Sequence, residues 1–444
     1  MPDDNNIRLP FGEKSSFDMD TADYRGDFRE MIQSRAYRIT PEMEEWLNKP
    51  ISETSIVACL RSFYEDAPVG LLIYFFEDDI LKVYFLTTQG FQFQGQAEVT
   101  LQEMSRLGAD LSLGLNLNKY SHNRAPRKRG MEWEDKSTQN APGDAENIIR
   151  TISALLFPEG LGENILQNRT EHLIIIPALN IQQIPFAILT PFADDTLFID
   201  KWSYSMAASL YEIARLTVRK QVSKSSEISF DKPSTLYRDA LFVGNPVFST
   251  EGNWILPQLP GAEEEVKIIS GQLSVAPEQV LIGPAATLPD IKTKGGNVSI
   301  LYLATHGIAD PENPLDGSGL FFTPTEDNPK GFWSAREIQQ ARFSAILVIL
   351  SACQTGLGQS QDTGVIGLSR AFQLAGAENI IMSLWSVDDN ATNSLMQLFM
   401  KKIHEPHRFF PCEPLRQAML TYRKQNPGAE PVYWASFSTF GIPY

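Results

Sequence analysis

The chain has 444 residues, and its 43% hydrophobic and 21% charged residues are ordinary for a globular protein large enough for roughly two or three domains. Its formal net charge of -16 argues against nucleic acid and anionic membranes as main partners, because both repel an acidic surface. Three cysteines are too few for a disulfide framework, and the acidic, polar N-terminus does not resemble a signal peptide. No apolar run approaches the roughly 20 residues of a membrane-spanning helix. We therefore expect a cytoplasmic protein.

The first 145 residues lack a regular alternation of elements. Residues 1–30 are polar and acidic, and we expect them to be extended or disordered. Residues 31–145 are expected to form an N-terminal α/β part. It would contain a helix within 35–64, a β-hairpin in "GLLIYFFEDDILKVYFLTTQG" and a helix within "AEVTLQEMSRLGADLSLGL".

Residues 120–140 are expected to be a long basic loop in this acidic chain. They include Arg124, Arg127, Lys128 and Arg129, with Pro and Gly and no apolar periodicity. The first interpretation is a solvated connector with a chance cluster of charge. The second is a docking or processing site, since exposed and mobile segments are what proteases and partners use.

From residue 146 to 444 helices alternate with short, continuously apolar strands. The expected helices lie at 146–157, 210–218, 261–273, from 287, and at 334–341, 364–376, 390–404 and 414–425. The expected strands lie at 172–179, 239–246, 279–283, 298–307, 345–353 and 379–387. This alternation predicts an α/β fold with a mostly parallel sheet and helices on both faces.

Two of these strands end in residues that can do chemistry. "LYLATHG" ends at His306 and Gly307, and "LVILSAC" ends at Cys353. The separation is 353 − 306 = 47 residues, enough for one strand–helix–strand crossover and a small hairpin around "GLFFT". Adjacent parallel strands would bring both side chains to one edge, as a thiol nucleophile and its base require. The N–H groups of Gly307 and Cys353 could then form an oxyanion hole.

A lone buried cysteine or histidine is more often structural than catalytic, so the pair carries the hypothesis. Cys59 and Cys412 are interpreted as structural, and His122, His172, His404 and His407 rank below His306. No CxxC pair or His/Cys cluster has metal-ligand spacing, and no phosphate-binding glycine motif appears. We therefore expect neither a metal nor a cofactor.

Several stretches resemble the motifs of a known family and occur in the same order as in that family. They are "LIIIPALNIQQIPFAIL", "LFVGNPVF", "LPGAEEEVKII", "LYLATHG", "LVILSACQTGLG", "GLSRAFQLAGAENIIMSLWSVDDNAT" and "YWASFSTFG". Over residues 145–444 the chain resembles the CHAT domain, a bacterial relative of caspases and separases. The resemblance implies a caspase-like fold and a His306/Cys353 dyad that hydrolyses peptide bonds. It also implies that residues 31–145 are similar to the inactive, pseudo-protease-like half of separase-like enzymes.

The function expected from this resemblance is a cysteine endopeptidase that cleaves a protein substrate. An activating protein partner and a role in bacterial defence or cell death are expected with it. The alternative is a CHAT-fold scaffold or interaction module without turnover. The intact His306 and Cys353 pair favours the enzyme.

The substrate-binding residues expected around the nucleophile are Ser351, Asp388 and Asp389. Ser351 supplies no charge, whereas "WSVDD" ends the strand after the nucleophile and resembles an acidic strand end of separases, which cut after arginine. One carboxylate of Asp388 or Asp389 would then favour Arg or Lys on the amino side of the cut. The alternative is that these residues cap the helix that follows.

Overall fold

The computed structural model describes residues 53–65, 67–77, 79–115, 117, 127–128, 145–178, 181–208, 210, 212–213, 239–250, 254–310, 313–351, 363–385, 389–403, 405 and 409–443. The N-terminal segment 1–30, for which disorder was expected, lies outside these residues. So do Cys353 and Asp388.

An eleven-stranded sheet runs through the molecule in the order β3-β2-β1-β5-β6-β16-β15-β14-β10-β7-β9. Its strands are β1 (Val69–Glu77), β2 (Ile80–Thr87), β3 (Gly90–Glu98), β5 (His172–Ile176), β6 (Ser203–Met206), β7 (Ala240–Gly244), β9 (Val280–Ile282), β10 (Ile300–Ala304), β14 (Leu347–Leu350), β15 (Asn379–Ser383) and β16 (Phe437–Gly441). Neighbouring strands are parallel except in the β1–β2, β2–β3 and β15–β16 pairs. The predicted mostly parallel sheet is confirmed.

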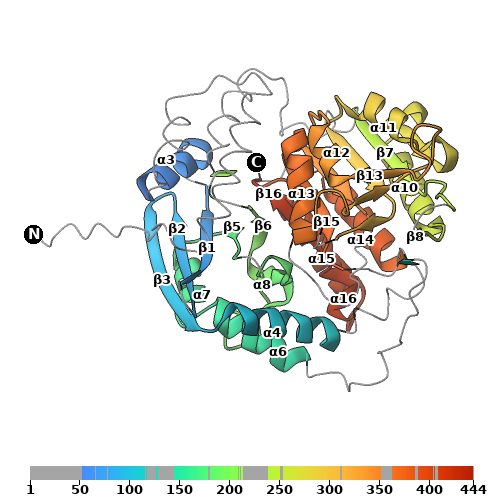
Figure 1. Ribbon diagram of the computed structural model, residues 1–444. Helices are drawn as coiled ribbons and strands as arrows, with labels where there is room; N and C mark the ends of the chain where they lie inside the picture. The colour runs from blue at the N-terminus through green and yellow to red at the C-terminus, as the bar shows by residue number, and fades with distance from the viewer. Residues whose placement is uncertain are drawn as a thin grey trace, which may run out of the picture.

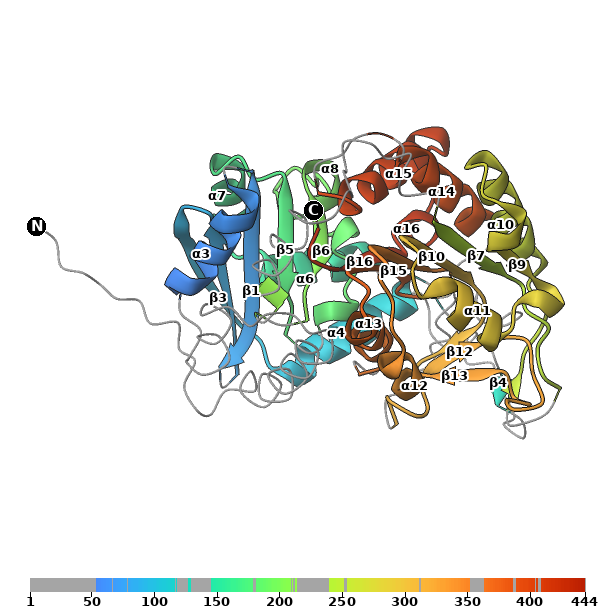
Figure 2. The same ribbon diagram turned by 90° about the horizontal axis from the view of Figure 1, so that it is seen from above.

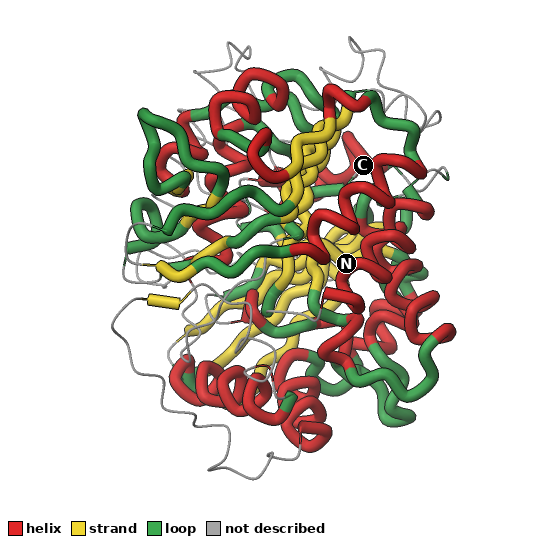
Figure 3. The backbone as a smooth tube through the Cα atoms, turned by 90° about the vertical axis from the view of Figure 1, so that its right-hand side faces the viewer, coloured by secondary structure: helices red, strands yellow, loops and turns green. Residues whose placement is uncertain are grey.

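Helices cover the sheet on both faces, as predicted (Figure 1). They are α3 (Glu53–Tyr64), α4 (Leu101–Gly114), α6 (Ala145–Leu156), α7 (Leu161–Gln167), α8 (Phe198–Lys201), α10 (Pro260–Gln272), α11 (Leu288–Gly295), α12 (Ala335–Gln340), α13 (Thr363–Ala375), α14 (Asp389–Lys402), α15 (Cys412–Gln425) and α16 (Pro431–Trp434). Around β7, β10, β14 and β15, Figure 2 shows α10, α14 and α15 on one face and α11, α12 and α13 on the other. Figure 3 shows the twisted sheet passing between the two helical layers.

The strands of this region are apolar because both of their faces are buried. Every residue of β7, β10 and β14 is buried, and the three sequences are "ALFVG", "ILYLA" and "LVIL". Continuous runs of this kind are typical of parallel strands under helices on both sides. They form the middle of the largest apolar cluster of the protein. The result is a rigid platform whose strand ends can hold side chains in fixed positions.

The N-terminal hairpin expected from the sequence joins the same sheet, because β1 pairs in parallel with β5. A third strand, β3, follows it and was not expected. Its sequence "GFQFQGQAE" is polar, which suits an edge strand with no fully buried residue. The helix expected from residue 97 begins at Leu101 instead, where Thr100 and Glu103 form a capping box.

Two further strands, β6 and β16, were also missed. Both carry serines at buried positions, where hydrogen bonds compensate for the burial of the polar groups. Tyr204 on β6 and Ser438 on β16 are hydrogen-bonded at 3.0 Å. Because β16 is antiparallel to β15 and parallel to β6, the carboxyl ends of β5 and β6 face the edge opposite to those of β10 and β14.

Two small sheets lie on the side of the molecule where β10 ends. The hairpin expected around "GLFFT" is part of a three-stranded sheet of β11 (Gly307–Ile308), β12 (Gly319–Phe321) and β13 (Phe332–Ser334). The second pairs β4 (Arg127–Lys128) with β8 (Trp254–Ile255). The basic segment 120–140, interpreted as loop throughout, therefore contains a short strand. The two residues of this strand pair with a segment more than 120 positions away, which no local sequence pattern indicates.

Candidate active site

β10 and β14 are adjacent and parallel, as the hypothesis of a shared strand edge requires. Their register pairs Ile300 with Leu347 and Leu303 with Leu350. His306 comes 306 − 303 = 3 residues after one member of the last pair, and Cys353 comes 353 − 350 = 3 residues after the other. The two residues thus follow neighbouring strands at equal chain distance. The geometry is described for His306; Cys353 itself lies outside the described residues.

The His306 ring is buried and held in one orientation. Only 1% of the residue is exposed, and its Nε2 lies 2.7 Å from the carbonyl oxygen of Pro257. A carbonyl only accepts hydrogen bonds, so Nε2 carries the proton and Nδ1 keeps its lone pair. Within the described residues Nδ1 has no hydrogen-bond partner. The ring of Phe248 packs against the imidazole, with centroids 4.7 Å apart. The orientation of the imidazole therefore leaves Nδ1 as the ring nitrogen that can accept a proton.

Asn245 fixes the segment that supplies the Pro257 carbonyl. It follows β7 with φ at 44°, a left-handed conformation that Asn tolerates better than most residues. Its Oδ1 accepts a hydrogen bond from the Leu259 N–H at 2.7 Å, and its Nδ2 donates to Glu263 Oε2 at 3.1 Å. Its own N–H donates to the Ala304 carbonyl at 3.1 Å. The backbone and side chain of this one residue thus tie the ends of β7 and β10 to the chain around Pro257.

The environment of His306 keeps the imidazole neutral. Burial lowers the pKa of His306 to about 4, and the hydrogen bond to the Pro257 carbonyl opposes that shift only in part. At pH 7 the ring therefore has an available lone pair and no charge. A neutral imidazole beside a thiol can accept its proton, which is the role of a general base.

The N–H group of Gly307 points away from the neighbouring strand β12. The Phe321 N–H donates to the His306 carbonyl at 2.9 Å, so His306 and Phe321 form a hydrogen-bonded antiparallel pair. Such pairs alternate with pairs that exchange no hydrogen bonds, and the next pair is Gly307 with Leu320. The alternation directs the Gly307 N–H away from β12. This direction suits the oxyanion role expected for Gly307.

The other cysteines are buried away from this edge. Cys59 lies in α3 and Cys412 begins α15, and they are 4% and 2% exposed. Burial is the main cause that raises the pKa of the Cys412 thiol far above its ordinary value. Their positions fit the structural roles expected for both.

Asp389 is the first residue of α14, which follows β15, and β15 is parallel to β14. The strand end that carries "WSVDD" therefore lies on the same edge as the ends of β10 and β14. The side chain of Asp389 and the whole of Asp388 lie outside the described residues. Their expected contact with a substrate stays a prediction.

An apolar cluster borders His306 on the side of β8. Its members are Phe248, Leu259, Ile308 and Phe321, with Trp254, Leu256, Ala262 and Phe332 packed against it. β8, which contains Trp254, pairs with Arg127–Lys128 of the basic segment and ends two residues before Pro257. A part of the N-terminal 145 residues therefore contacts the chain that orients His306.

Sequence reasoning missed Glu265, which contacts both strands that lead to the site. Its carboxylate accepts a hydrogen bond from the Tyr302 hydroxyl at 2.6 Å, and it is also hydrogen-bonded to Ser351. Ser351, expected to contact substrate, thus uses its hydroxyl inside the protein. The signal was present in "PGAEEEVKII": the third glutamate lies four residues before Ile269, on the apolar face of α10.

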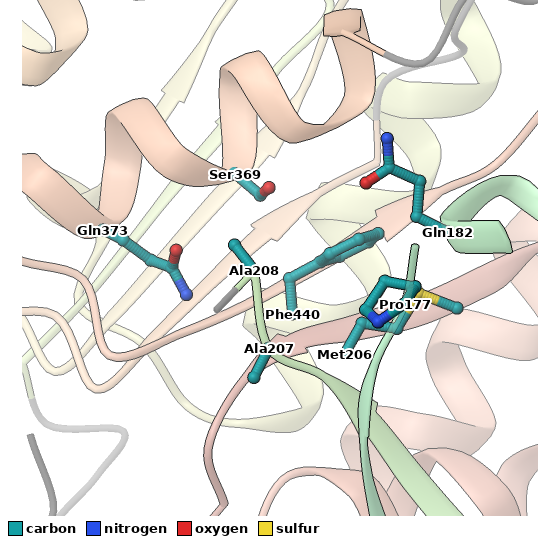
Figure 4. Close-up of a pocket in the computed structure, with 8 residues that line it drawn as sticks. All are labelled: Pro177, Gln182, Met206, Ala207, Ala208, Ser369, Gln373 and Phe440. Atoms are coloured by element: carbon teal, nitrogen blue, oxygen red, sulfur yellow. The ribbon is translucent and has the colours of Figure 1, made fainter. Parts of the chain in front are cut away.

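A pocket also exists at the carboxyl ends of β5 and β6, where Pro177 and Ala207 follow the strands (Figure 4). Ser369 and Gln373 of α13 line it with Phe440 of β16. Because β5 and β6 run opposite to β10 and β14, this pocket opens at the other edge of the sheet. It is separate from the His306 site.

Within the described residues, no group of three or more His, Cys, Asp or Glu side chains is arranged to hold a metal ion. In the same part of the chain, no helix has the length and apolar character needed to cross a membrane.

Comparisons with known proteins agree with the sequence resemblance. The family model described as CHAT domain matches residues 146–442. Tetratricopeptide repeat protein 28 of Mus musculus is 22% identical over 312 residues, which cover 62% of this chain. The protein of that name from Homo sapiens is 22% identical over 308 residues, also 62% of this chain. The match spans 12% of the length of each of these relatives.

Two solved structures are similar in outline. A chain of the Saccharomyces cerevisiae separase–securin complex has a TM-score of 0.49 at 10% identity, over 94% of this chain and 33% of that chain. The Arg specific cysteine proteinase gingipain R has a TM-score of 0.42 at 11% identity, over 67% of each chain. Both TM-scores are below 0.5.

Proposed function

The chain belongs to the CHAT domain family, and from this membership and the geometry around His306 we propose that it is a caspase-like cysteine endopeptidase acting on a protein substrate. The observation that carries the proposal is the orientation of His306: Nε2 is hydrogen-bonded to the Pro257 carbonyl, and Nδ1 has no partner within the described residues. The equal spacing of His306 and Cys353 from the Leu303–Leu350 pair supports it.

In the proposed reaction His306 Nδ1 takes the proton of the Cys353 thiol as the sulfur attacks the carbonyl carbon of the scissile peptide. The N–H groups of Gly307 and Cys353 donate hydrogen bonds to the oxyanion that forms. The imidazolium then gives its proton to the leaving amine, and the acyl group stays on sulfur as a thioester. Water, deprotonated by His306, hydrolyses the thioester and restores the thiol.

Two finer features belong to the same proposal. Asp388 or Asp389 would select Arg or Lys before the cut, because a carboxylate at the strand edge complements a basic side chain. A protein partner would activate the enzyme, in bacterial defence or cell death, as the family resemblance implies. The alternative is a CHAT-fold scaffold without turnover.

The experiment that separates enzyme from scaffold is labelling with a peptide that carries a thiol-directed electrophile. The wild type should be labelled at Cys353, Cys353→Ala should not be labelled, and Cys412→Ala should behave as the wild type because Cys412 is buried. His306→Ala should slow labelling, since the thiol loses its base. Absence of Cys353-dependent labelling, with and without candidate partners, would favour the scaffold.

A further inference from the structure

A buried polar cluster lies between α10 and the two strands that end at the site. Glu265 and Tyr302 are 2% and 0% exposed, and the Tyr302 hydroxyl donates to Glu265 Oε1 at 2.6 Å. The Ser351 hydroxyl lies within hydrogen-bonding reach of both groups. We name these three residues the Glu265 cluster. It joins a helix on one face of the sheet to two adjacent parallel strands.

The position of the Glu265 cluster relates it to the proposed dyad. Tyr302 is in the middle of β10, four residues before His306, and Ser351 is two residues before Cys353. Tyr302 is also fixed sideways, because its register partners are Ile349 of β14 and Phe242 of β7. Its ring stacks on Phe242 with centroids 5.2 Å apart. The cluster therefore connects the chain segments that carry the two proposed catalytic residues.

Stability alone gives little reason for a carboxyl group at this place. No described residue forms a salt bridge with Glu265. The pKa of Glu265 is raised to about 7, because the effect of burial outweighs the opposing effect of the hydrogen bonds to Tyr302 and Ser351. A well-packed apolar side chain is usually no worse than a buried charge for the free energy of unfolding. The cost of keeping Glu265 buried points to a role in the site.

No other titratable group competes for Glu265 in the described surroundings. The elements with the most extensive packing against α10 are β7, β9, β10 and α14. β7 and β9 carry no charged residue, and β10 contributes Tyr302. The charged residues of α14 are Asp389, Lys401 and Lys402, and those of α10 itself are Glu263, Glu264 and Lys267. Tyr302 and Ser351 are the groups that interact with the carboxyl group.

We propose that Glu265 is a positioning residue: by holding Tyr302 and Ser351 together, its carboxylate sets the separation between the segments that carry His306 and Cys353. The proposal rests on the peptidase function proposed above. Each hydroxyl group has one proton to donate, and an ionised carboxylate accepts both protons in charge-assisted hydrogen bonds, one from Tyr302 and one from Ser351. Protonation of Glu265 removes the negative charge and makes the hydrogen bonds to its oxygens weaker. Protonation of Glu265 therefore loosens the connection.

The test measures the rate constant for alkylation of Cys353 by iodoacetamide, followed by peptide mapping, because this needs no substrate turnover. Glu265→Gln should slow alkylation about tenfold at pH 8, the effect of losing one good hydrogen bond. Tyr302→Phe and Ser351→Ala should slow it about threefold each. Glu264→Gln, at an exposed neighbour on the same helix, should have no effect.

Two readouts separate positioning from general stability. The ratio of wild-type to Glu265→Gln rates should rise between pH 6 and pH 8, where Glu265 ionises in the wild type only. With a peptide substrate, Glu265→Gln should lower kcat about tenfold and leave KM within about twofold. Equal alkylation rates in the two proteins at every pH, or rates that follow only the folded fraction, would overturn the proposal.

The proposal and the peptidase function fail separately. If the wild type cleaves no peptide, with and without candidate partners, but its Cys353 alkylation depends on Glu265, the peptidase function is wrong and the positioning role stands. If the wild type cleaves peptides and Glu265→Gln is unchanged in both assays, the peptidase function stands and the positioning role is wrong.

Discussion

Leu303 of β10 and Leu350 of β14 are partners in a parallel pairing, and each comes three residues before a member of the proposed dyad. Cys353→Ala should abolish peptide cleavage, and His306→Ala should lower kcat/KM by about a thousandfold or more, because nucleophile and base act as one unit. The double variant should be no worse than Cys353→Ala. The measurement is kcat/KM with a fluorogenic peptide, with circular dichroism to verify folding.

Cys59→Ala and Cys412→Ala are the matched controls for that experiment, since both thiols are buried away from the site. They should keep activity within about threefold of the wild type at a temperature where they are folded. If Cys412→Ala lost activity while Cys353→Ala kept it, Cys353 would not be the nucleophile.

Asn245 should matter for activity although it is not part of the dyad. Its Oδ1 holds the Leu259 N–H, and Leu259 is two residues after Pro257, whose carbonyl orients His306. Asn245→Gly keeps the left-handed backbone at little cost and removes both side-chain hydrogen bonds. We expect kcat to fall about tenfold with KM nearly constant.

Asn245→Asp is the comparison variant, because it keeps the acceptor for the Leu259 N–H and loses the donor to Glu263. It should retain more activity than Asn245→Gly if the tie to Leu259 is the important one. Wild-type kcat in Asn245→Gly would show that the Pro257 carbonyl is held without this side chain.

His306 should act as a base at unusually acidic pH. Burial lowers its pKa from 6.5 to about 4, so it stays neutral as pH falls from 6.5 to 5. The Glu265 carboxyl group also titrates near this range, so the measurement uses the Glu265→Gln variant, which lacks that group. In this variant kcat/KM should change less than about twofold between pH 6.5 and pH 5. If His306 had the ordinary histidine pKa, kcat/KM would instead fall more than tenfold over this range. The measurement is kcat/KM against pH, with stability monitored in parallel.

His172 should make the protein less stable in acid. Its ring is buried at the start of β5, hydrogen-bonded to Ser203 at 2.9 Å and Ser205 at 3.3 Å, and burial lowers its pKa from 6.5 to about 3. Between these values the unfolded chain binds a proton that the folded one does not. The stabilisation is therefore complete above pH 6.5 and is lost as pH falls toward 3, by about 1.4 kcal/mol per pH unit.

His172→Gln should flatten that dependence, because an amide can hydrogen-bond to the serines but does not titrate in this range. Denaturant unfolding at pH 7 and pH 5 measures it. An unchanged slope in the variant would assign the acid sensitivity to other groups.

The proposed specificity pocket predicts a preference for Arg or Lys before the cut. A peptide library profiled at fixed enzyme concentration should show it, and Asp388→Asn or Asp389→Asn should lower the preference about tenfold. Asp290→Asn, at an exposed position in the first turn of α11, is the control and should change nothing. A preference for Asp, or for an apolar residue that both variants retain, would contradict the prediction.

The strands that could be predicted from the sequence are those in which nearly every side chain is apolar, since such strands can be buried without distant hydrogen-bond partners. β7, β10 and β14 are apolar along their whole length, so their sequences indicated buried parallel strands. β6 and β16 could not be recognised in this way, because the partners that compensate their buried serines lie far along the chain. Tyr204 and Ser438, which are hydrogen-bonded to each other, are 234 residues apart.

For the site, the sequence by itself determined which residues could do the chemistry: His306 with Gly307 after one apolar strand, and Cys353 after another. Local pattern suffices there, since a strand exit is visible in the order of apolar and polar residues. Only the tertiary structure decided how the imidazole is oriented and which buried carboxyl group joins the strands. Pro257 is 49 residues before His306, and Glu265 is 37 residues before Tyr302. Such contacts depend on the packing of β7, β10 and α10, and no local sequence pattern contains that information.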